Sequence, residues 1–410
     1  MTLSPPAPPP SSTVFQGPGV WIDPEALAQL TAVAALEGCV RAAGMPDLHP
    51  GRGIPIGAVV ATREVVYPRL VGGDAGCGAR VVVTDVGRLS LDRLERRVRG
   101  AFEASPLDGA DPSALFEAVW AEGARGLGRV EGLPEGLRAL ADREPAVAPQ
   151  RESVGWSGGG AGFVASLGTI GGGNHFAEIA RVETVVDPAG AAALGMVRGA
   201  VVVLVHSGSR GLGAALAARW ADASLRSPRI GGYLDELRGV CRFAEANRLV
   251  LTWRLLSALG AVREDAQVGG FDVIHNDVRS EEVGGAEAWV HRKGAAPAYP
   301  EGFTVVLGSR GAPSWIVQGT GIEAGLCSVA HGAGRRYGRT EALRRGKERY
   351  RRSELTRSAT GGRLLCDDPD LLYEEHPDAY KAIEPVMASL EAHGLARRVA
   401  SLSPAITVKL

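Results

Sequence analysis

Glycine is the feature of this sequence that most constrains its fold, because 56 of the 410 residues are glycine. Glycine-rich segments lie beside nearly every short run of β-branched residues, for example beside residues 56–62 and 200–205. Glycine permits tight turns and a close approach of the backbone to a neighbouring group. The pattern predicts short strands joined by tight loops, and binding and catalytic residues are commonly found in such loops.

The spacing of apolar residues predicts helices and strands that alternate along the chain. Amphipathic periodicity favours helices over residues 91–103 and 112–124, and one long helix or two consecutive helices over 234–262. Because the sequence shows no internal repeat and no clear linker, we expect a single catalytic domain over residues 13–410. Short apolar runs favour buried strands over residues 56–62, 80–85, 176–181, 200–205 and 304–307.

The composition favours a protein of a reducing compartment. The 45 Lys and Arg nearly balance the 46 Asp and Glu, so any binding of nucleic acid must come from a local patch. Five scattered cysteines form neither a disulfide framework nor a paired zinc motif, and no apolar stretch approaches the roughly 20 residues of a membrane span. Residues 1–12 lack the basic and apolar regions of a signal peptide. We therefore expect a cytoplasmic protein with a disordered leader over residues 1–12 and no membrane association.

Five potential metal ligands lie in short polar motifs. Asp74 and Cys77 belong to GGDAGCGA, His175 to GGGNHFAEI, His206 to VHSGSRGLG and His275 to IHNDV. A carboxylate, a thiolate and three imidazoles suffice for one metal ion, or for two ions that share a ligand. Thiolate and imidazole ligands favour zinc, whereas the carboxylate also allows a harder ion. The alternative is that each is an ordinary buried residue of the core.

Glycine-rich turns that contain an arginine suggest phosphate binding. They occur at residues 208–211, 308–311 and 331–335. Consecutive backbone N–H groups in such turns form anion sites, and an arginine adds charge-assisted contacts. The alternative is that they are only tight turns. The chain has neither a GxxxxGK[ST] phosphate loop nor a Lys-x-Asp-Gly nucleophile motif.

His331 opens the third of these turns, and Arg335 closes it. An imidazole can attack phosphorus when a metal neutralises the phosphate, and a nearby arginine can stabilise the charge that develops. His331 is therefore a candidate nucleophile and Arg335 a candidate catalytic partner. The alternative is a structural or helix-capping histidine.

A basic segment follows this turn. Residues 335–363 contain eleven Lys and Arg against three Glu. Such an excess of positive charge predicts a track for a phosphate backbone. The alternative is a solvated helix face whose charges are balanced by acidic residues elsewhere in the chain.

Further motifs extend along nearly the whole chain after the leader, and these, besides those of the metal ligands, are MPDLHPGRGIPIG (45–57), HN (275–276), HRKGA (291–295), GSRGAPSWIVQG (308–319), AHGAGRRYGRTEA (330–342), AYKAIEPV (379–386) and the terminal SPAITVK. Together the motifs resemble the RtcB family of GTP-dependent RNA-splicing ligases. The resemblance implies an α+β fold, with central β-sheets flanked by helices in a single large domain and a metal site at strand-loop junctions.

The resemblance implies ligation of RNA in three nucleotidyl-transfer steps with GTP and two Mn²⁺ ions. His331 would attack the α-phosphate of GTP, GMP would pass to an RNA 3′-phosphate, and a 5′-hydroxyl would then displace GMP. A 2′,3′-cyclic phosphate would first be opened to the 3′-phosphate. The ligands of the family match Asp74, Cys77, His175, His206 and His275, with the thiolate bridging both ions.

The nucleotide pocket of the family maps onto six further positions of this chain. In such a pocket a carboxylate can accept from guanine N1–H, a lysine can donate to O6 and a tyrosine can stack on the ring. Asp47 matches an acidic residue that the later steps need and would orient the 5′-hydroxyl, whereas its residue type alone suggests a turn. The six pocket positions are Asn174, Phe176, Glu178, Ser309, Tyr380 and Lys409.

The chain departs from the family pattern at Ala75 and Ala79, beside the metal ligands, and at Arg310, where the family has methionine. Arg310 would place a cation near the nucleotide pocket. The alternatives are a divergent paralogue that acts as a metal-dependent phosphoesterase or other RNA end-processing enzyme, and a non-catalytic RNA-binding protein. The resemblance also suggests archease as a partner, and it leaves open whether the RNA is tRNA halves or damaged RNA.

Overall fold

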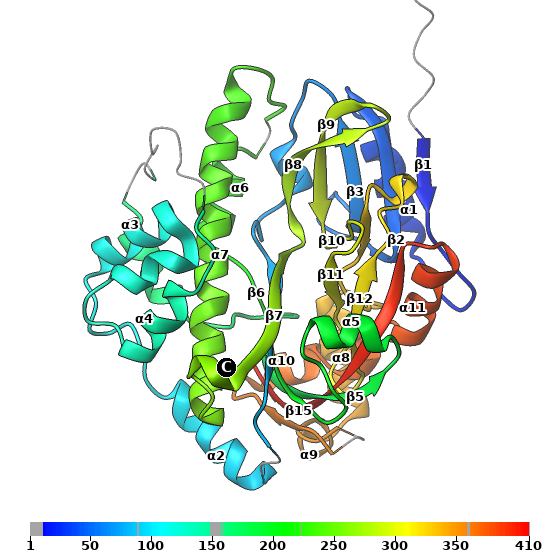
Figure 1. The fold of residues 1–410 in the computed structure, drawn as a ribbon. Coiled ribbons are helices and arrows are strands. Elements are labelled where there is room, and N and C mark those ends of the chain that lie inside the picture. Colours follow the sequence, from blue (N-terminus) through cyan, green and yellow to red (C-terminus); the bar gives the residue numbers. More distant parts are fainter. Residues whose placement is uncertain are drawn as a thin grey trace, which may run out of the picture.

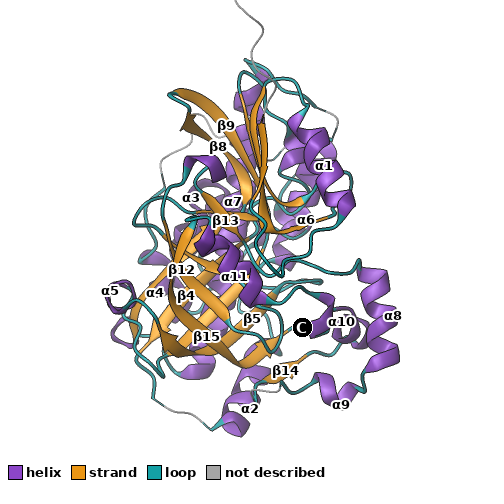
Figure 2. Cartoon of the chain, turned by 90° about the vertical axis from the view of Figure 1, so that its right-hand side faces the viewer, coloured by secondary structure: helices purple, strands orange, loops and turns teal. Residues whose placement is uncertain are grey.

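A computed structural model describes residues 11–87, 90–147, 156, 159–221, 223–358 and 361–409 of the chain. Over these residues, β-sheets form the centre of the molecule and helices cover them (Figures 1 and 2). The expected α+β fold with central sheets and flanking helices is therefore confirmed.

The largest sheet of the described chain has the strand order β11-β12-β15-β5-β6-β4-β7, with β14 paired to β15. Its pairs are antiparallel except that of β14 with β15. Its strands are β4 (Gly78–Thr84), β5 (Phe176–Val185), β6 (Val201–Ser207), β7 (Gln267–Ile274), β11 (Phe303–Val306), β12 (Ser314–Gly319), β14 (Arg363–Leu365) and β15 (Ala396–Val408).

A second sheet has the order β1-β2-β3-β9-β8, and a small two-stranded sheet joins β10 to β13. Among the strand pairs described for the second sheet, β1 with β2 is parallel and the others are antiparallel. The strands of these two sheets are β1 (Ser11–Val14), β2 (Cys39–His49), β3 (Ile56–Thr62), β8 (Asn276–Val283), β9 (Ala286–Lys293), β10 (Ala295–Pro297) and β13 (Ser328–Ala330).

The longest helix, α7 (Arg229–Leu259), lies between the large sheet and the helices α3 and α4 (Figure 1). It ends at Gly260, which adopts the left-handed conformation that commonly terminates helices. No helix of the described chain has both the length and the apolar character needed to cross a membrane. The other helices are α1 (Pro24–Ala34), α2 (Leu91–Phe102), α3 (Pro112–Glu122), α4 (Glu135–Asp142), α5 (Pro188–Ala193), α6 (Gly211–Arg219), α8 (Arg339–Arg349), α9 (Arg352–Leu355), α10 (Pro369–Glu374) and α11 (Ile383–Ala392).

The large sheet is buried on both faces, as the alternation of side chains along β6 shows. Val203 and Val205 pack in the hydrophobic cluster that contains the α7 residue Leu249. Val202 and Leu204 belong to a second cluster, which extends to the strands of the other sheet. Successive side chains of a strand point to opposite faces, so a wholly apolar run such as β6 is what burial on both faces requires.

Each helix and strand that the sequence analysis predicted is present in the structure, and several of them begin or end a few residues away from the predicted positions. The strand over 56–62 is β3, and the helical pattern over 234–262 is the single helix α7, which begins earlier than expected, at Arg229, and ends at Leu259. Burial of Ile230 and Tyr233 stabilises the added turns although two glycines follow Ile230. The strand β1 begins at Ser11, within the last two residues of the expected leader, and pairs with β2. Residues 1–10 lie outside the described residues.

Candidate active site

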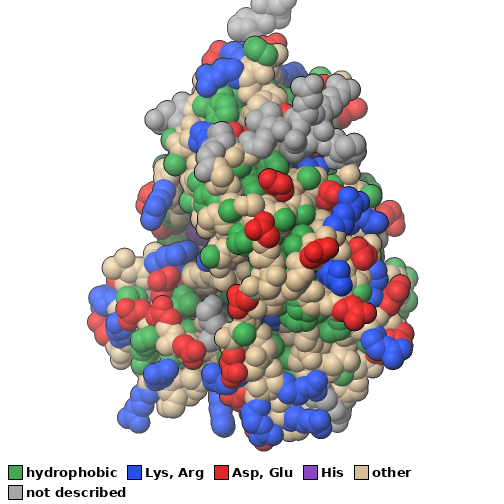
Figure 3. All heavy atoms as spheres, turned by 90° about the vertical axis from the view of Figure 1, so that its left-hand side faces the viewer, with side chains coloured by type: hydrophobic (Ala, Val, Ile, Leu, Met, Phe, Trp, Pro, Cys, Tyr) green, Lys and Arg blue, Asp and Glu red, His purple; other side chains and the backbone are tan. Residues whose placement is uncertain are grey.

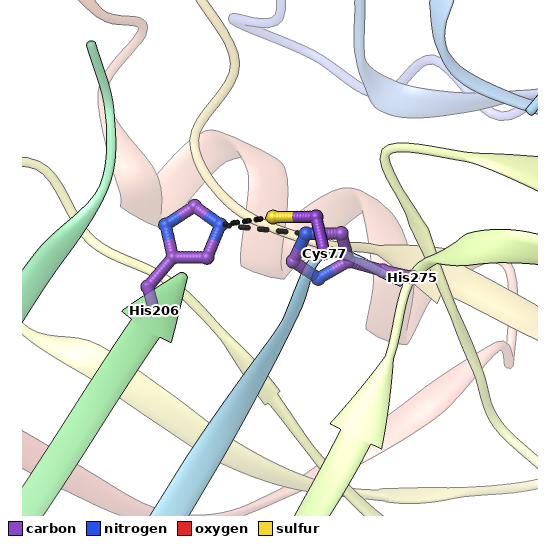
Figure 4. Close-up of side chains that lie close together, drawn as sticks. All are labelled: Cys77, His206 and His275. Atoms are coloured by element: carbon purple, nitrogen blue, oxygen red, sulfur yellow. Dashed lines mark hydrogen bonds between the residues drawn. The ribbon is translucent and has the colours of Figure 1, made fainter. Parts of the chain in front are cut away.

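Four of the five predicted metal ligands lie at one end of the large sheet. Cys77 directly precedes β4, His175 directly precedes β5, His206 is near the end of β6 and His275 directly follows β7. These strands are antiparallel neighbours, so the starts of β4 and β5 lie beside the ends of β6 and β7. The topology thus gathers residues that are far apart in the sequence, and Figure 4 shows three of them converging.

The ligand atoms lie within one small cluster. The sulfur of Cys77 is 3.3 Å from Nε2 of His175 and 3.4 Å from Nε2 of His206. Nε2 of His206 is 3.3 Å from Nε2 of His275, and the Asp74 carboxylate is 3.0 Å from Nε2 of His175. The atoms form two groups that share the thiolate, Cys77-His206-His275 and Asp74-Cys77-His175.

The donor set fits divalent metal ions. Separations of 3.3–3.4 Å between sulfur and nitrogen are close to those of two donors bound to one ion. Nδ1 of His206 lies 3.2 Å from the carbonyl oxygen of Asn174, to which it can donate, and this leaves the lone pair of Nε2 directed at the cluster. The residues present could hold two ions that share Cys77, and the Asp74 carboxylate admits an ion harder than zinc.

Burial sets the protonation of the cluster. It lowers the pKa of His206 and of His275 well below the ordinary value of 6.5, so both rings are neutral near pH 7. Burial, together with the nearby Asp74 carboxylate, raises the pKa of the Cys77 thiol well above 9. A bound metal must therefore displace the thiol proton, whereas the imidazoles are already in the form that binds metal.

His331 lies beside this cluster and is held by Asp47. It directly follows β13, and its ring centroid is 4.9 Å from that of His275. Nδ1 of His331 is 2.7 Å from the buried Asp47 carboxylate of β2, so Nε2 is the ring nitrogen left for chemistry. Gly334 has a φ of 74°, and a Cβ there would lie 2.2 Å from the carbonyl oxygen of Asp47. The turn after His331 therefore requires glycine at this position.

A cavity of about 460 Å³ opens next to His331 and His206. This volume lies within the usual range of small-molecule sites. All six residues that the resemblance assigned to a nucleotide pocket line it, namely Asn174, Phe176, Glu178, Ser309, Tyr380 and Lys409.

Two charged groups of the cavity wall have perturbed protonation. Burial raises the pKa of Glu178 to about 7, and Thr407 donates a 2.5 Å hydrogen bond to its carboxylate. Burial lowers the pKa of Lys409 to about 8. The Lys409 ammonium donates to the carbonyl oxygens of Gly173 and His175, at 2.7 and 2.9 Å, which ties the C-terminal strand to the metal cluster.

Arg335 lines the same cavity but already has partners. Its guanidinium is 2.6 Å from the Glu375 carboxylate and 3.3 Å from the Tyr380 hydroxyl, and it lies over the Tyr380 ring. Tyr380 also donates a hydrogen bond to Glu375. Glu375 and Thr407 are contacts that the sequence analysis did not identify. Glu375 stands in none of the quoted motifs, and Thr407 lies in the terminal SPAITVK, where the resemblance assigns a role to Lys409 alone.

The arginines of the other glycine turns differ in their surroundings. Arg210 reaches the metal cluster, with Nη1 3.5 Å from Nδ1 of His175. Arg310 lines the cavity as expected, but its Nη2 donates to the carbonyl oxygen of Leu372, and its Nη1 is buried with no partner among the described residues. The departures Ala75 and Ala79 are both buried.

Seven of the eleven basic residues of the segment 335–363 form ion pairs, as the alternative of a charge-balanced helix face predicts, and binding of a phosphate backbone by the segment stays a prediction. Arg344 and Arg345 pair with glutamates of their own helix, α8. Other residues of the segment pair with acidic residues elsewhere in the chain. On the face drawn in Figure 3, the side of the molecule that carries α3 and α4 in Figure 1, basic and acidic side chains are likewise intermingled. The remaining pairs are Arg335–Glu375, Arg339–Glu374, Lys347–Asp370, Arg349–Asp378 and Arg363 with Asp92 and Glu95.

Comparison with known proteins places the chain in a family. The family model described as "tRNA-splicing ligase RtcB" matches residues 29–410. The chain is 35% identical to RNA-splicing ligase RtcB2 of Escherichia coli, over 95% of this chain and 93% of that protein. It is 32% identical to RNA-splicing ligase RtcB of Mycobacterium tuberculosis, over 93% of this chain and 100% of that protein, and 29% identical to tRNA-splicing ligase RtcB of Aeropyrum pernix, over 92% and 90%. The chain belongs to the RtcB family, and it is therefore an enzyme.

Proposed function

We propose that this protein is an RNA ligase that joins 3′-phosphate or 2′,3′-cyclic phosphate ends to 5′-hydroxyl ends, with GTP and Mn²⁺. The names of its relatives, RNA-splicing and tRNA-splicing ligases, support RNA as the substrate. The observation that carries the proposal is the position of His331, between the candidate metal cluster and the cavity that contains Glu178 and Lys409.

In the first step, Nε2 of His331 attacks the α-phosphorus of GTP. A P–N bond forms, the bond to the β-phosphate oxygen breaks, and pyrophosphate leaves with the electron pair. Asp47 accepts the Nδ1–H hydrogen bond, which directs the lone pair of Nε2 into the cavity and stabilises the positive charge of the ring. Two divalent ions bound at the cluster would stabilise the charge on the α-phosphate and on the leaving oxygen in this displacement.

In the later steps the guanylate moves to the RNA. An oxygen of the RNA 3′-phosphate attacks the phosphorus of the His331 phosphoramidate and restores the free imidazole. The 5′-hydroxyl of the second RNA then attacks the activated 3′-phosphate, a phosphodiester forms and GMP leaves. A cyclic phosphate enters the sequence after water has opened it to the 3′-phosphate.

The buried end of the cavity suits guanine. The Glu178 carboxylate can accept from N1–H and the exocyclic amine, and the Lys409 ammonium retains a donor for O6 after its two bonds to carbonyl oxygens. Phe176 and Tyr380 contribute aromatic surface to the same wall, on which the base can stack.

The proposal is tested by incubating the protein with α-labelled GTP and Mn²⁺. We expect an acid-labile, alkali-stable protein–GMP adduct, seen also as a mass increase of the intact chain, that is lost in His331→Ala. His393→Ala is the matched control, because His393 is exposed and lies against Phe15, away from the cavity. Absence of an adduct in the wild-type protein over a range of divalent metals would contradict the proposal.

The same metal cluster could instead activate water in a phosphoesterase, which would not need His331. Release of phosphate from an RNA 3′-phosphate by wild-type protein and by His331→Ala alike would identify that activity. Archease as a partner stays a prediction, tested by adding it to the ligation assay. The cytoplasm stays our proposed location, and the five free cysteines support a reducing compartment.

A further inference from the structure

The middle of α7 contains two adjacent polar residues, Asn247 and Arg248, that are completely buried. Burial of an arginine is costly unless its charge is paired and its N–H groups have acceptors. The partners of this pair are backbone groups of the glycine-rich loops around the candidate metal cluster, the Ser207 hydroxyl and one carboxylate.

Arg248 joins the loops that carry two of the candidate ligands. Its Nη1 donates to the carbonyl oxygens of Gly76, at 2.8 Å, and of Ser207, at 3.0 Å. Gly76 directly precedes Cys77, and Ser207 directly follows His206. One guanidinium nitrogen thus fixes the backbone beside the thiolate and beside an imidazole at once.

The remaining N–H groups of the Arg248 guanidinium bind β7, the strand that leads to His275. Nη2 and Nε of Arg248 donate to the Asp272 carboxylate of β7, at 2.6 and 3.0 Å. β7 ends at Ile274, directly before His275. Arg248 therefore connects the three chain segments that carry the Cys77-His206-His275 group, through Gly76, Ser207 and the side chain of Asp272, and none of its hydrogen bonds among the described residues is to the ligand atoms themselves.

Asn247 adds a second set of bonds on the same side of α7. Its amide nitrogen donates to Ser207 Oγ at 3.0 Å and to the carbonyl oxygen of Gly208 at 3.1 Å. Its carbonyl oxygen accepts from the backbone N–H of Gly168 at 2.7 Å. The loop after His206 is thus bound to α7 by both residues of the pair.

The loop of Cys77 also rests directly on α7. Gly76 has a φ of 76°, and a Cβ there would lie 2.9 Å from Cα of Cys241. The backbone of the loop thus packs directly on the backbone of α7, with no room for a side chain at position 76. The loop that carries Cys77 is therefore packed against α7, and this packing limits where the Cys77 side chain can lie.

We propose that Arg248 is a positioning residue that, with Asn247, sets the separation of Cys77, His206 and His275 and thereby the affinity and geometry of the metal ion they bind. This inference rests on the proposed metal function of the cluster. Residues behind metal ligands typically change affinity by about 10- to 100-fold when they are substituted. A purely structural arginine would affect folding and leave the bound ion unchanged.

The test is a titration of the metal-free protein with Co²⁺, followed by the thiolate-to-cobalt and ligand-field absorption bands. Arg248→Lys keeps the charge but cannot reach both carbonyl oxygens and Asp272 in the same planar geometry. We expect it to bind Co²⁺ about 10-fold or more weakly and to alter the absorption spectrum. Asn247→Ala should shift the same bands in a protein that retains Arg248.

Arg292→Lys is the matched control. Arg292 is also fully buried, pairs with the Glu281 carboxylate and donates to the carbonyl oxygen of Leu326, but neither of these partners adjoins a candidate metal ligand in the chain. We expect this variant to lose thermal stability and to keep the wild-type Co²⁺ affinity and spectrum.

The outcomes separate this inference from the proposed function. A wild-type protein that binds no Co²⁺ or Mn²⁺ would overturn both. A wild-type protein that binds Co²⁺, with the same affinity and spectrum in Arg248→Lys and Asn247→Ala, would overturn the positioning role alone, as would an equal loss in Arg292→Lys. If Arg248→Lys does not fold, Asn247→Ala decides, because unchanged Co²⁺ bands in that variant contradict the inference.

Discussion

The carboxylate of Asp47 lies 2.7 Å from Nδ1 of His331, although 284 positions separate the two residues in the chain. Asp47 is fully buried, and the Lys381 ammonium donates to the carbonyl oxygens of Pro46 and Leu48 on either side of it. The pair fixes which nitrogen of His331 faces the cavity. Asp47 is thus placed to act on the first step of the proposed reaction, earlier than the orientation of a 5′-hydroxyl that the resemblance implied.

We expect Asp47→Asn to slow guanylylation of His331 on the order of 10²-fold, because an amide that donates to Nδ1 leaves the ring proton on Nε2. The initial rate of adduct formation from α-labelled GTP measures the effect. Asp265→Asn is the control. Asp265 is exposed and pairs with Arg263, so this variant should leave the rate unchanged. A wild-type rate in Asp47→Asn would show that the carboxylate does not orient the nucleophile.

Substitution of the shared thiolate should remove metal from both groups of the cluster. Cys77→Ala leaves each group with two ligands, and no other sulfur lies within either group of the described residues. We expect metal analysis after dialysis to find less than half of the wild-type Mn²⁺ or Co²⁺, with activity lost in parallel. Cys366→Ala is the control, because Cys366 is also buried but belongs to neither group. Full metal content in Cys77→Ala would contradict the sharing of this ligand.

Strands were predicted correctly where a run of apolar residues alone identifies them. The strand over 56–62 was located because its run of apolar residues is uninterrupted, whereas β15 was missed because Pro404 and two arginines interrupt its pattern. Pro404 is tolerated there because the strand register shifts between Pro404 and Ile406. Proline lowers the strand propensity of the segment that contains it. The pairing of β15 with β5, which accommodates Pro404, cannot be seen in the sequence.

For the candidate site, residue types and the family resemblance supplied the components, and the topology supplied their arrangement. Cys77 and His206 are predictable as ligands from their chemistry, but their proximity follows from the pairing of β4 with β6. Arg248 has no signal in the sequence, because it lies within a helical pattern like any solvated arginine. The ion pairs of Arg363 at the end of the basic segment are equally unpredictable, since its partners Asp92 and Glu95 lie far away in the chain.

The affinity for guanosine should rise with pH through about 7. Burial raises the pKa of Glu178 to about 7, so below this pH the carboxyl is protonated and presents fewer acceptors to guanine. Guanosine has no phosphate that titrates in this range, and calorimetric titration between about pH 6 and 7.5 stays below the pKa of about 8 of Lys409, the other titratable group proposed to contact the base. Glu178→Gln should remove the pH dependence, and Glu183→Gln, on the exposed part of β5, should keep it. A wild-type affinity that is constant over this range would exclude Glu178 as the partner of the base.

Lys409→Met should weaken both nucleotide use and metal binding, because one ammonium serves both parts of the site. Lys409 is buried, and its Nζ holds the carbonyl oxygens of Gly173 and His175 while it lines the cavity. We expect the KM for GTP in adduct formation to rise about 10-fold, which corresponds to the loss of one charged hydrogen bond of about 1.5 kcal/mol. Lys347→Met, on an exposed lysine of α8, is the control. If only the KM changes and Co²⁺ affinity does not, the bonds to the loop of His175 do not position that ligand. If neither changes, the cavity does not bind the base at this end.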